Sequence, residues 1–224
     1  MQSFTHVLSF APVRTRWVLT LVALIAVARS ASATQIVSTF DTDLDGWTSS
    51  PGGSMTFGAT GGNPGGFLRD VDLDNTDMFV SAPAKFLGDK SAFAAGTVSF
   101  DGIELDAGPG DYQPYGTVTL RSGATSIQAD LVPLGQPTVN WSTFNIPLNA
   151  TTFGTAPNTF ASVLGNLTAV EVLTESKVGL VETVGLDNFT LAAPSPEPTP
   201  AAAVMGIVML VCARVRSARK AGWF

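Results

Sequence analysis

Short stretches in which apolar and polar residues alternate run through the middle of the chain, from residue 34 to residue 191. Val118 and Leu120 alternate with polar neighbours, and Ile127 and Ala129 do the same. A period of two is typical of a strand that buries one face. Glycine, proline, asparagine and aspartate separate the stretches, as expected for turns. The pattern therefore predicts a series of short β-strands.

One of these stretches changes phase at Gly102. Apolar residues occupy alternate positions on both sides of this glycine, but the two sets are out of step: Val98 and Phe100, then Ile103 and Leu105. We expect a break in the strand at Gly102 that keeps all four apolar side chains on the buried face. Glu104 then faces solvent.

A single segment follows the period of a helix. Four apolar residues recur at the spacing i, i+3, i+4 and i+7: Phe160, Val163, Leu164 and Leu167. This spacing predicts one short helix that ends near residues 165–168. Many strands with one helix favour an all-β antiparallel sandwich of the jelly-roll type, for which about 160 residues suffice without disulfide bonds. Six aromatic residues should be largely buried in its core: Phe40, Trp47, Phe86, Phe100, Phe144 and Phe189.

Residues 1–33 have the layout of a secretory signal peptide. Arg14 and Arg16 precede an apolar stretch over residues 17–27, and Ala31-Ser32-Ala33 forms an A-x-A cleavage site. The alternative is an uncleaved membrane anchor, but the apolar stretch is well short of the roughly 20 residues that span a bilayer. We therefore predict export and cleavage after Ala33.

The other end of the chain has three parts. Residues 192–200 form a proline-rich linker, residues 201–213 are apolar, and a cluster of basic residues follows within residues 214–220. The apolar part would reach only about 20 Å as a helix, against a hydrocarbon core of about 30 Å. Residues 201–224 would therefore serve only weakly as a permanent membrane anchor.

Pro196-Glu197-Pro198, a short apolar segment and a terminal basic cluster together resemble the PEP-CTERM sorting tail of Gram-negative bacteria that make exopolysaccharide. The resemblance implies transient contact with the inner membrane and recognition by a membrane protease of the exosortase type. It also implies loss of the apolar tail, followed by release of the domain or its attachment to the cell surface.

The scarcity of reactive residues excludes several classes of chemistry from the middle of the chain. His6 and Cys212 are the only histidine and cysteine, and both lie in the terminal segments. Catalysis by Ser-His-Asp or Cys-His groups, zinc sites of thiolates or imidazoles and structural disulfides are therefore excluded. Residues 34–194 carry 17 acidic and five basic residues, a balance that repels nucleic acid and anionic membranes. Carboxylate chemistry, calcium or ligand binding remain.

The segment Ser81-Ala82-Pro83-Ala84-Lys85-Phe86-Leu87-Gly88-Asp89 resembles a signature of the laminin B domain, also called laminin IV type A. Further pieces follow in that family's order, including Phe40-Asp41, Gly46-Trp47, Phe93-Ala94-Ala95-Gly96 and Leu186-Asp187-Asn188-Phe189. The resemblance covers nearly all of residues 34–191. It implies an extracellular, non-catalytic jelly roll akin to carbohydrate-binding modules, with no particular ligand.

The segment from Asp41 to Gly46 has the spacing D-x-D-x-D-G, which presents alternating carboxylates to a hard cation. It is not an EF-hand, because Gly52 stands where the bidentate glutamate would be. One interpretation is a solvated acidic turn. The other is a calcium site of Asp41, Asp43 and Asp187, with Asp45 or a backbone carbonyl as a further ligand.

Two more groups of acids bear on function. Asp70, Asp72 and Asp74 share one face of a predicted strand, which requires either exposure to solvent or a cation between them. Glu104-Leu105-Asp106 resembles the start of the catalytic strand of jelly-roll glycosidases, but the second glutamate of that motif is absent. The sequence therefore predicts no enzyme.

Four aromatic residues suit contact with sugar rings. Trp47 and Trp141 lie in the motifs shared with the laminin B family and are assigned to the core. Tyr112 and Tyr115 lie in the loop of residues 108–116 and are the predicted glycan contacts.

The sequence thus predicts a secreted, surface-sorted, non-enzymatic protein of the extracellular matrix of a Gram-negative bacterium, which binds exopolysaccharide or another glycan. The first alternative is a structural or adhesive matrix component with no small ligand. The second is a polysaccharide hydrolase that depends on carboxylates.

Overall fold

The computed structural model describes residues 33–179 and 181–195. Almost all of the predicted signal peptide, and the predicted sorting tail, lie outside these residues. The described part contains 11 strands and one α-helix. The strands are β1 (Gln35–Ser38), β2 (Thr48–Ser49), β3 (Gly53–Gly62), β4 (Gly65–Asp72), β5 (Phe79–Ser81), β6 (Thr97–Glu104), β7 (Val118–Ser122), β8 (Thr125–Ala129), β9 (Ser142–Pro147), β10 (Ala169–Leu173) and β11 (Thr183–Ala192), and the helix is α1 (Pro157–Leu164).

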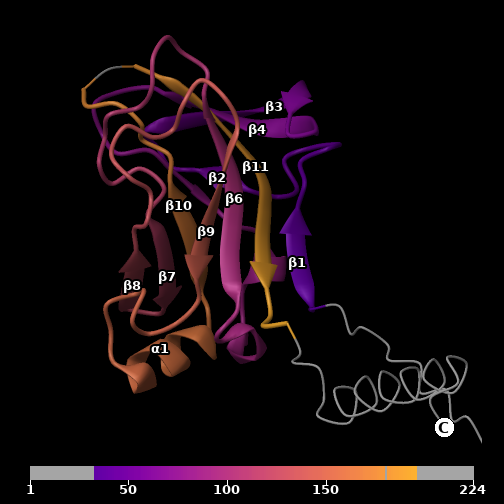
Figure 1. Cartoon of the computed structure of the whole chain (residues 1–224), viewed down its shortest axis with the longest axis vertical. Coiled ribbons are helices and arrows are strands. Elements are labelled where there is room, and N and C mark those ends of the chain that lie inside the picture. Colours follow the sequence, from indigo (N-terminus) through magenta and orange to yellow (C-terminus); the bar gives the residue numbers. More distant parts are fainter. Residues whose placement is uncertain (1–32, 180, 196–224) are drawn as a thin grey trace, which may run out of the picture. The chain divides into compact units, whose positions relative to one another are not determined.

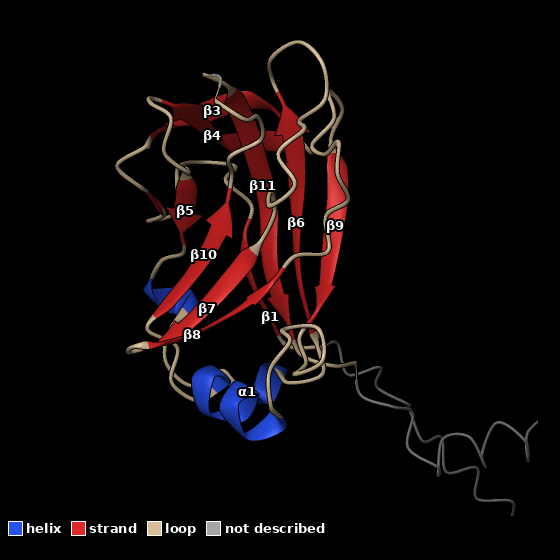
Figure 2. Ribbon diagram, turned by 90° about the vertical axis from the view of Figure 1, so that its left-hand side faces the viewer, coloured by secondary structure: helices blue, strands red, loops and turns tan. Residues whose placement is uncertain are grey.

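The strands form two sheets that face each other (Figures 1 and 2). Sheet A has the order β3-β4-β11-β6-β9, and β1 also pairs with β11; sheet B has the order β2-β5-β10-β7-β8. All of the strand pairs are antiparallel. The prediction of an all-β antiparallel sandwich with one short helix is therefore confirmed.

Aromatic side chains fill the space between the sheets. The Trp47 ring meets three phenylalanine rings edge to face, with the Phe189 centroid 4.8 Å away. Five of the six aromatic residues predicted to be buried are at most 3% exposed. The sixth, Phe144, is half-buried because it lies on β9 at the edge of sheet A, where it packs against Phe100.

Strand β6 continues through Gly102 without the predicted break. Its inward positions hold Phe100, Gly102 and Glu104, so that Glu104 is 1% exposed while Leu105 is 39% exposed. The prediction that Glu104 faces solvent is therefore wrong. A Cβ at Gly102 would lie 2.4 Å from the Tyr115 hydroxyl oxygen, so the glycine provides space for a buried ring rather than a change of phase.

The alternation of inward and outward side chains is interrupted in strand β11 instead of in β6. Its register shifts between Asp187 and Thr190, where Asn188 has a φ of 51°. Asparagine adopts this left-handed conformation more readily than most residues. The bulge lets Leu186 and Phe189, three positions apart, both face the core. It leaves Asp187 on the opposite face of sheet A.

Helix α1 begins with Pro157 in its first turn, a position where proline loses no helical hydrogen bond. Its buried residues are Phe160, Val163 and Leu164, as the spacing in the sequence predicts. It packs against β7 and β8 and covers one end of the sandwich. Within the described residues, no helix is both long and apolar enough to cross a membrane.

We predict that Leu186→Ala lowers the free energy of unfolding by about 2 to 5 kcal/mol, because the change leaves a cavity between the sheets. Leu134→Ala is the matched control, since the Leu134 side chain is 67% exposed while that of Leu186 is 1% exposed. The control should change stability by no more than about 0.5 kcal/mol. Urea unfolding of both variants checks this, and equal losses would contradict the placement of the core.

Candidate functional site

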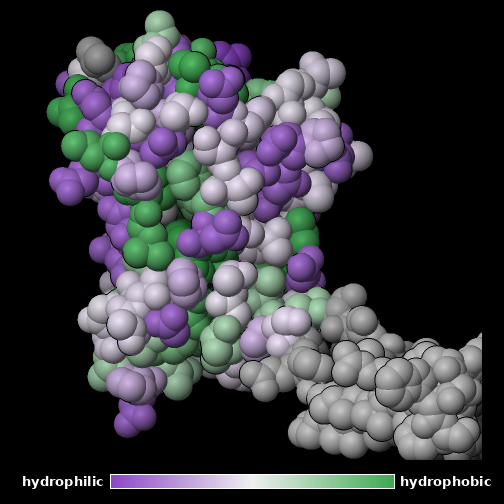
Figure 3. Space-filling model, in the orientation of Figure 1, coloured by the Kyte–Doolittle hydropathy of each residue, from purple (hydrophilic) through white to green (hydrophobic). Residues whose placement is uncertain are grey.

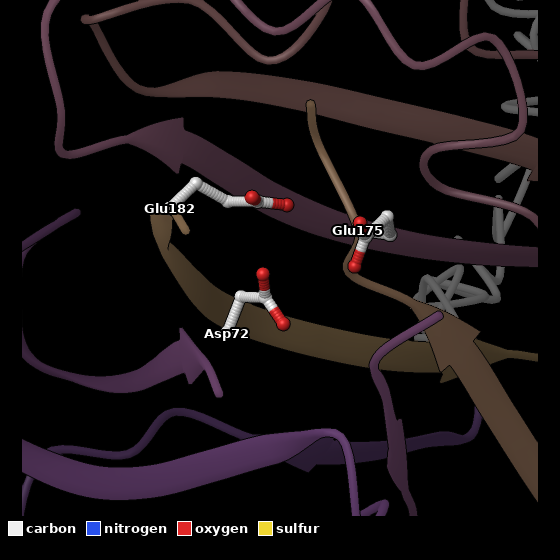
Figure 4. Close-up of side chains that lie close together, drawn as sticks. All are labelled: Asp72, Glu175 and Glu182. Atoms are coloured by element: carbon white, nitrogen blue, oxygen red, sulfur yellow. The ribbon is translucent and has the colours of Figure 1, made fainter. Parts of the chain in front are cut away.

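Three buried acids meet at one end of the sandwich. Strands β4, β6 and β10 end there and β7, β9 and β11 begin there, and we call it the loop end. Asp72 is the last residue of β4, Glu175 follows β10, and Glu182 precedes β11. Their side chains converge from three segments (Figure 4), and one oxygen of each lies within 4.8 Å of the others. We call these three residues the acidic trio.

The alternation of β4 brings Asp72 inward. Leu68, Asp70 and Asp72 occupy the buried positions of this strand, whereas Arg69 is exposed. The backbone N–H of Asp72 donates to the Glu182 carbonyl at 2.9 Å, which fixes the two acids side by side.

Backbone N–H groups position the other carboxylates. The Met78 N–H donates to Glu175 Oε2 at 3.2 Å, and the Ser176 and Lys177 N–H groups donate to Glu182 Oε1. The second oxygen of Glu182, Oε2, is buried and has no hydrogen-bond partner. Such atoms are rare in folded proteins. This oxygen therefore requires a ligand or a proton.

The trio is nearly excluded from solvent, with exposed fractions of 2% for Asp72, 4% for Glu175 and 0% for Glu182. Burial, aided by the charge of Glu182, raises the pKa of Glu175 to about 7. Burial also raises the pKa of Glu182. The three salt bridges of the described residues join Asp45 to Lys85, Glu171 to Arg121 and Glu104 to Lys177, so none of them neutralises the trio.

Two more buried carboxylates lie close by. Asp70 accepts hydrogen bonds from the Ser49 and Thr174 hydroxyls, both at 2.9 Å, and burial raises its pKa. Glu104 accepts a hydrogen bond of 2.6 Å from the Ser176 hydroxyl. The Lys177 ammonium is 3.6 Å from the Glu104 carboxylate.

The interpretation of Asp70 and Asp72 as solvent-exposed acids is therefore wrong, because both project between the sheets. Asp74 lies beyond the end of β4 and is exposed. Glu175 and Glu182 were missed by the sequence analysis. Each lies next to one end of an apolar strand segment. That position was the only feature of the sequence that could have indicated them as site residues.

The acids of the predicted calcium site are only partly brought together. Asp41 and Asp187 both lie against the turn between β3 and β4: a Cβ at Gly65 would be 2.1 Å from Asp41 Oδ1, and one at Gly62 would be 2.9 Å from Asp187 Oδ2. Asp187 accepts hydrogen bonds from the N–H groups of Asn63 and Asn188, at 2.6 and 2.7 Å. Burial, aided by the nearby charges of Asp101 and Asp41, raises its pKa to about 6.

Asp43 and Asp45 have other contacts. Asp43 is exposed, and its carboxylate accepts a hydrogen bond of 2.7 Å from the N–H of Asp45. Asp45 accepts a hydrogen bond from Ser38 and pairs with Lys85, which neutralises its charge. A calcium ion held by Asp41, Asp43 and Asp187 stays a prediction.

The two predicted glycan contacts differ in exposure. Tyr115 is 2% exposed and packs edge to face against Phe144, so the prediction that it contacts a glycan is wrong. The close approach of its hydroxyl to Gly102 holds the ring in the core. Tyr112 is half-buried, and its hydroxyl donates to Asp77 at 2.9 Å.

The outer face of sheet B carries a small apolar pair next to a group of polar side chains. Phe79 and Leu173 are direct partners across β5 and β10, and both are half-buried. Beside them, Arg121 Nε donates to Glu171 at 2.9 Å, and the Gln128 amide donates to the Thr119 hydroxyl. We call these six residues the sheet B face.

No protein family model matches the chain, and no curated protein matches its sequence. The fold resembles the L4b domain of human laminin alpha-2, with 9% identity and a TM-score of 0.42 over 56% of this chain and 80% of that chain. It also resembles a family 11 carbohydrate-binding module of a Clostridium thermocellum cellulase, with 16% identity and a TM-score of 0.46 over 73% and 97% of the chains. A xylan-binding domain of Paenibacillus barcinonensis Xyn10C has 14% identity and a TM-score of 0.48 over 74% and 98%. These likenesses concern the fold alone.

We predict that the cation-free protein loses stability as the pH rises from about 5 to about 7.5. The folded state keeps the Glu175 proton up to a pKa of about 7, whereas the unfolded chain releases it near the ordinary value of 4.5. The folded state therefore binds more protons in this window, and the free energy of unfolding falls with pH. Urea unfolding with excess chelator measures the slope. Glu175→Gln should reduce the slope and Glu171→Gln should preserve it; equal slopes in all three proteins would contradict the account.

Proposed function

We propose that this chain is an exported, non-enzymatic protein of a bacterial extracellular matrix that binds glycan through the sheet B face. The observation that carries the proposal is the arrangement of that face. Phe79 and Leu173 offer an apolar surface for a sugar ring, and Arg121, Glu171 and Gln128 offer charged and amide groups for its hydroxyls.

The rigidity of the face supports this role. Its polar groups project from hydrogen-bonded strands, and the ion pair between Arg121 and Glu171 restricts both side chains. Groups held in place before binding lose less conformational entropy on binding. Tyr112 lies in the segment that leads into β7, and its hydroxyl donates to Asp77 in the loop that precedes β5.

Burial of the acids supports a non-enzymatic role. Hydrolysis of a polysaccharide requires two carboxylates that reach the glycosidic bond, about 5 to 5.5 Å apart in retaining enzymes. The trio is at most 4% exposed, and a polymer cannot enter it. The Glu104 carboxylate is occupied by Ser176 and Lys177.

Export and sorting are proposed from the sequence. Residues 1–33 and 196–224 carry the secretory layout and the PEP-CTERM-like tail. On this proposal an exosortase-type protease removes the tail at the inner membrane of a Gram-negative bacterium. The domain then reaches the cell surface or the surrounding matrix.

A purely adhesive matrix component is the second candidate, and one observation favours it. In the described part of the chain, the exposed large apolar side chains all lie in loops at the loop end, where Figure 3 shows hydrophobic residues among hydrophilic ones. Exposed apolar groups that gather in one region are typical of a protein contact surface. They are Leu73, Leu105, Leu131, Leu134, Val139, Val178 and Val181.

We predict that exopolysaccharide from the native host retards the protein in affinity electrophoresis and that Arg121→Ala weakens binding about tenfold, because it removes charge-assisted hydrogen bonds. Gln128→Ala should weaken binding by a smaller factor. Asn145→Ala is the matched control, since Asn145 is an exposed amide on β9, the edge strand of sheet A. Absence of retardation, or an equal effect of the control, would favour the adhesive candidate.

We predict that the mature protein from its native host begins near Thr34 and ends before Ala201. Signal peptidase would cut after Ala33, and the sorting protease would remove the apolar tail. Intact-mass measurement of extracellular material determines both ends. Recovery of residues 212–224 in that material would contradict removal of the tail.

A further inference from the structure

We propose that Asp72, Glu175 and Glu182 bind a calcium ion between the two sheets at the loop end. This site is separate from the one predicted at Asp41, Asp43 and Asp187, and it does not rest on glycan binding.

The oxygens of the trio are close enough to share one ion. An oxygen of each of the three carboxylates lies within 4.8 Å of the others. A calcium ion with ligands at about 2.3 to 2.6 Å holds oxygens up to roughly 5 Å apart. One ion placed between them can therefore contact all three carboxylates after small movements of the side chains.

One oxygen of the trio has no hydrogen-bond partner. Glu182 Oε2 is buried without a hydrogen bond, and the Glu182 carboxylate points toward Asp72 and Glu175 (Figure 4). Ionised carboxylates only accept hydrogen bonds, so neither neighbour satisfies this oxygen. A cation in the space between the three side chains satisfies it.

Backbone hydrogen bonds preorganise the three carboxylates. Backbone N–H groups of Asp74, Met78 and Ser176 hold one oxygen of Asp72, Glu175 and Glu182, respectively, at 3.1, 3.2 and 2.9 Å. Hydrogen bonds of this kind orient metal-ligating carboxylates.

The chemistry of the ligands selects the ion. All three are carboxylates, which prefer hard cations over zinc or copper. Magnesium usually keeps several waters and binds one or two carboxylates, whereas calcium accepts six to eight oxygens in flexible geometry. Three convergent carboxylates therefore favour calcium, with waters or carbonyls completing its coordination.

The ion would join both sheets. Asp72 and Glu182 belong to the β4 and β11 side of sheet A, whereas Glu175 follows β10 of sheet B. Binding at the trio therefore stabilises the folded state.

Isothermal titration of the chelator-treated protein with calcium chloride tests the proposal. Glu182→Gln, which keeps the shape of the side chain, should weaken calcium binding by at least tenfold or remove one equivalent of bound ion. Asp187→Asn should retain binding at the trio, and so should Glu171→Gln, whose carboxylate pairs with Arg121 outside it. Excess magnesium should compete poorly.

Thermal melting separates loss of the site from loss of the fold. In chelator, Glu182→Gln should melt at or above the wild-type temperature, because it removes one like charge from the trio. Calcium should raise the melting temperature of the wild type by several degrees and that of Glu182→Gln by much less. Unchanged calcium binding by Glu182→Gln, loss of binding only in Asp187→Asn, or no binding by the wild type would overturn the proposal. The glycan assay is independent of these outcomes, because the sheet B face does not include the trio.

Discussion

Repulsion between carboxylates buried at the loop end is the constraint on which the account of this protein depends. Two unit charges about 4 to 5 Å apart repel by roughly 3 to 4 kcal/mol at an effective dielectric constant of about 20. Asp72, Glu175 and Glu182 are all at most 4% exposed, and the nearest described ion pair, between Lys177 and Glu104, neutralises a neighbour instead. The folded state therefore requires bound protons or a bound cation at this end.

The rest of the sandwich places and protects that cluster. The aromatic core around Trp47 and Phe189 holds the sheets together, and the inward positions of β4 and β6 then bring Asp70, Asp72 and Glu104 between them. Hydrogen bonds from Ser49 and Thr174 to Asp70 connect the sheets across this polar layer. The sheet B face lies on β5, β7, β8 and β10 and points outward. The proposed glycan site thus uses the outer face of sheet B, whereas the proposed calcium site uses the space between the sheets at the loop end.

The sequence predicted the features that depend on local periodicity. The strands and the helix of residues 157–164 follow from spacings of two and of three to four. Of the five buried aromatic residues, Phe40, Trp47 and Phe86 lie outside the strands, in segments that resemble the laminin B family. The spacing of apolar residues could not predict which side chains of β6 face the core after Gly102. Its missing side chain can indicate either a bulge or space for another group, and only the position of Tyr115, 13 residues later, decides between them.

The acidic trio could not be predicted from local spacing either, because it depends on residues that are far apart in the sequence. Asp72 is separated from Glu175 and Glu182 by more than 100 residues. The pairing of β4 with β11 brings Asp72 to Glu182, and the packing of sheet B on sheet A adds Glu175. The spacing of Asp70 and Asp72 did indicate a shared face, but burial of that face depends on sheet B. Conversely, the close spacing of Asp41, Asp43 and Asp45 suggested one site, whereas the turn directs Asp43 to a backbone N–H and Asp45 to Lys85.

An anomalous difference map from crystals grown in calcium chloride tests the central claim most directly. The account predicts a peak between Asp72, Glu175 and Glu182, about 2.3 to 2.6 Å from an oxygen of each carboxylate. Absence of a peak there at a pH above 7, with the three carboxylates joined by short oxygen-to-oxygen contacts, would show that protons satisfy the cluster. That result would contradict the claim that calcium does so.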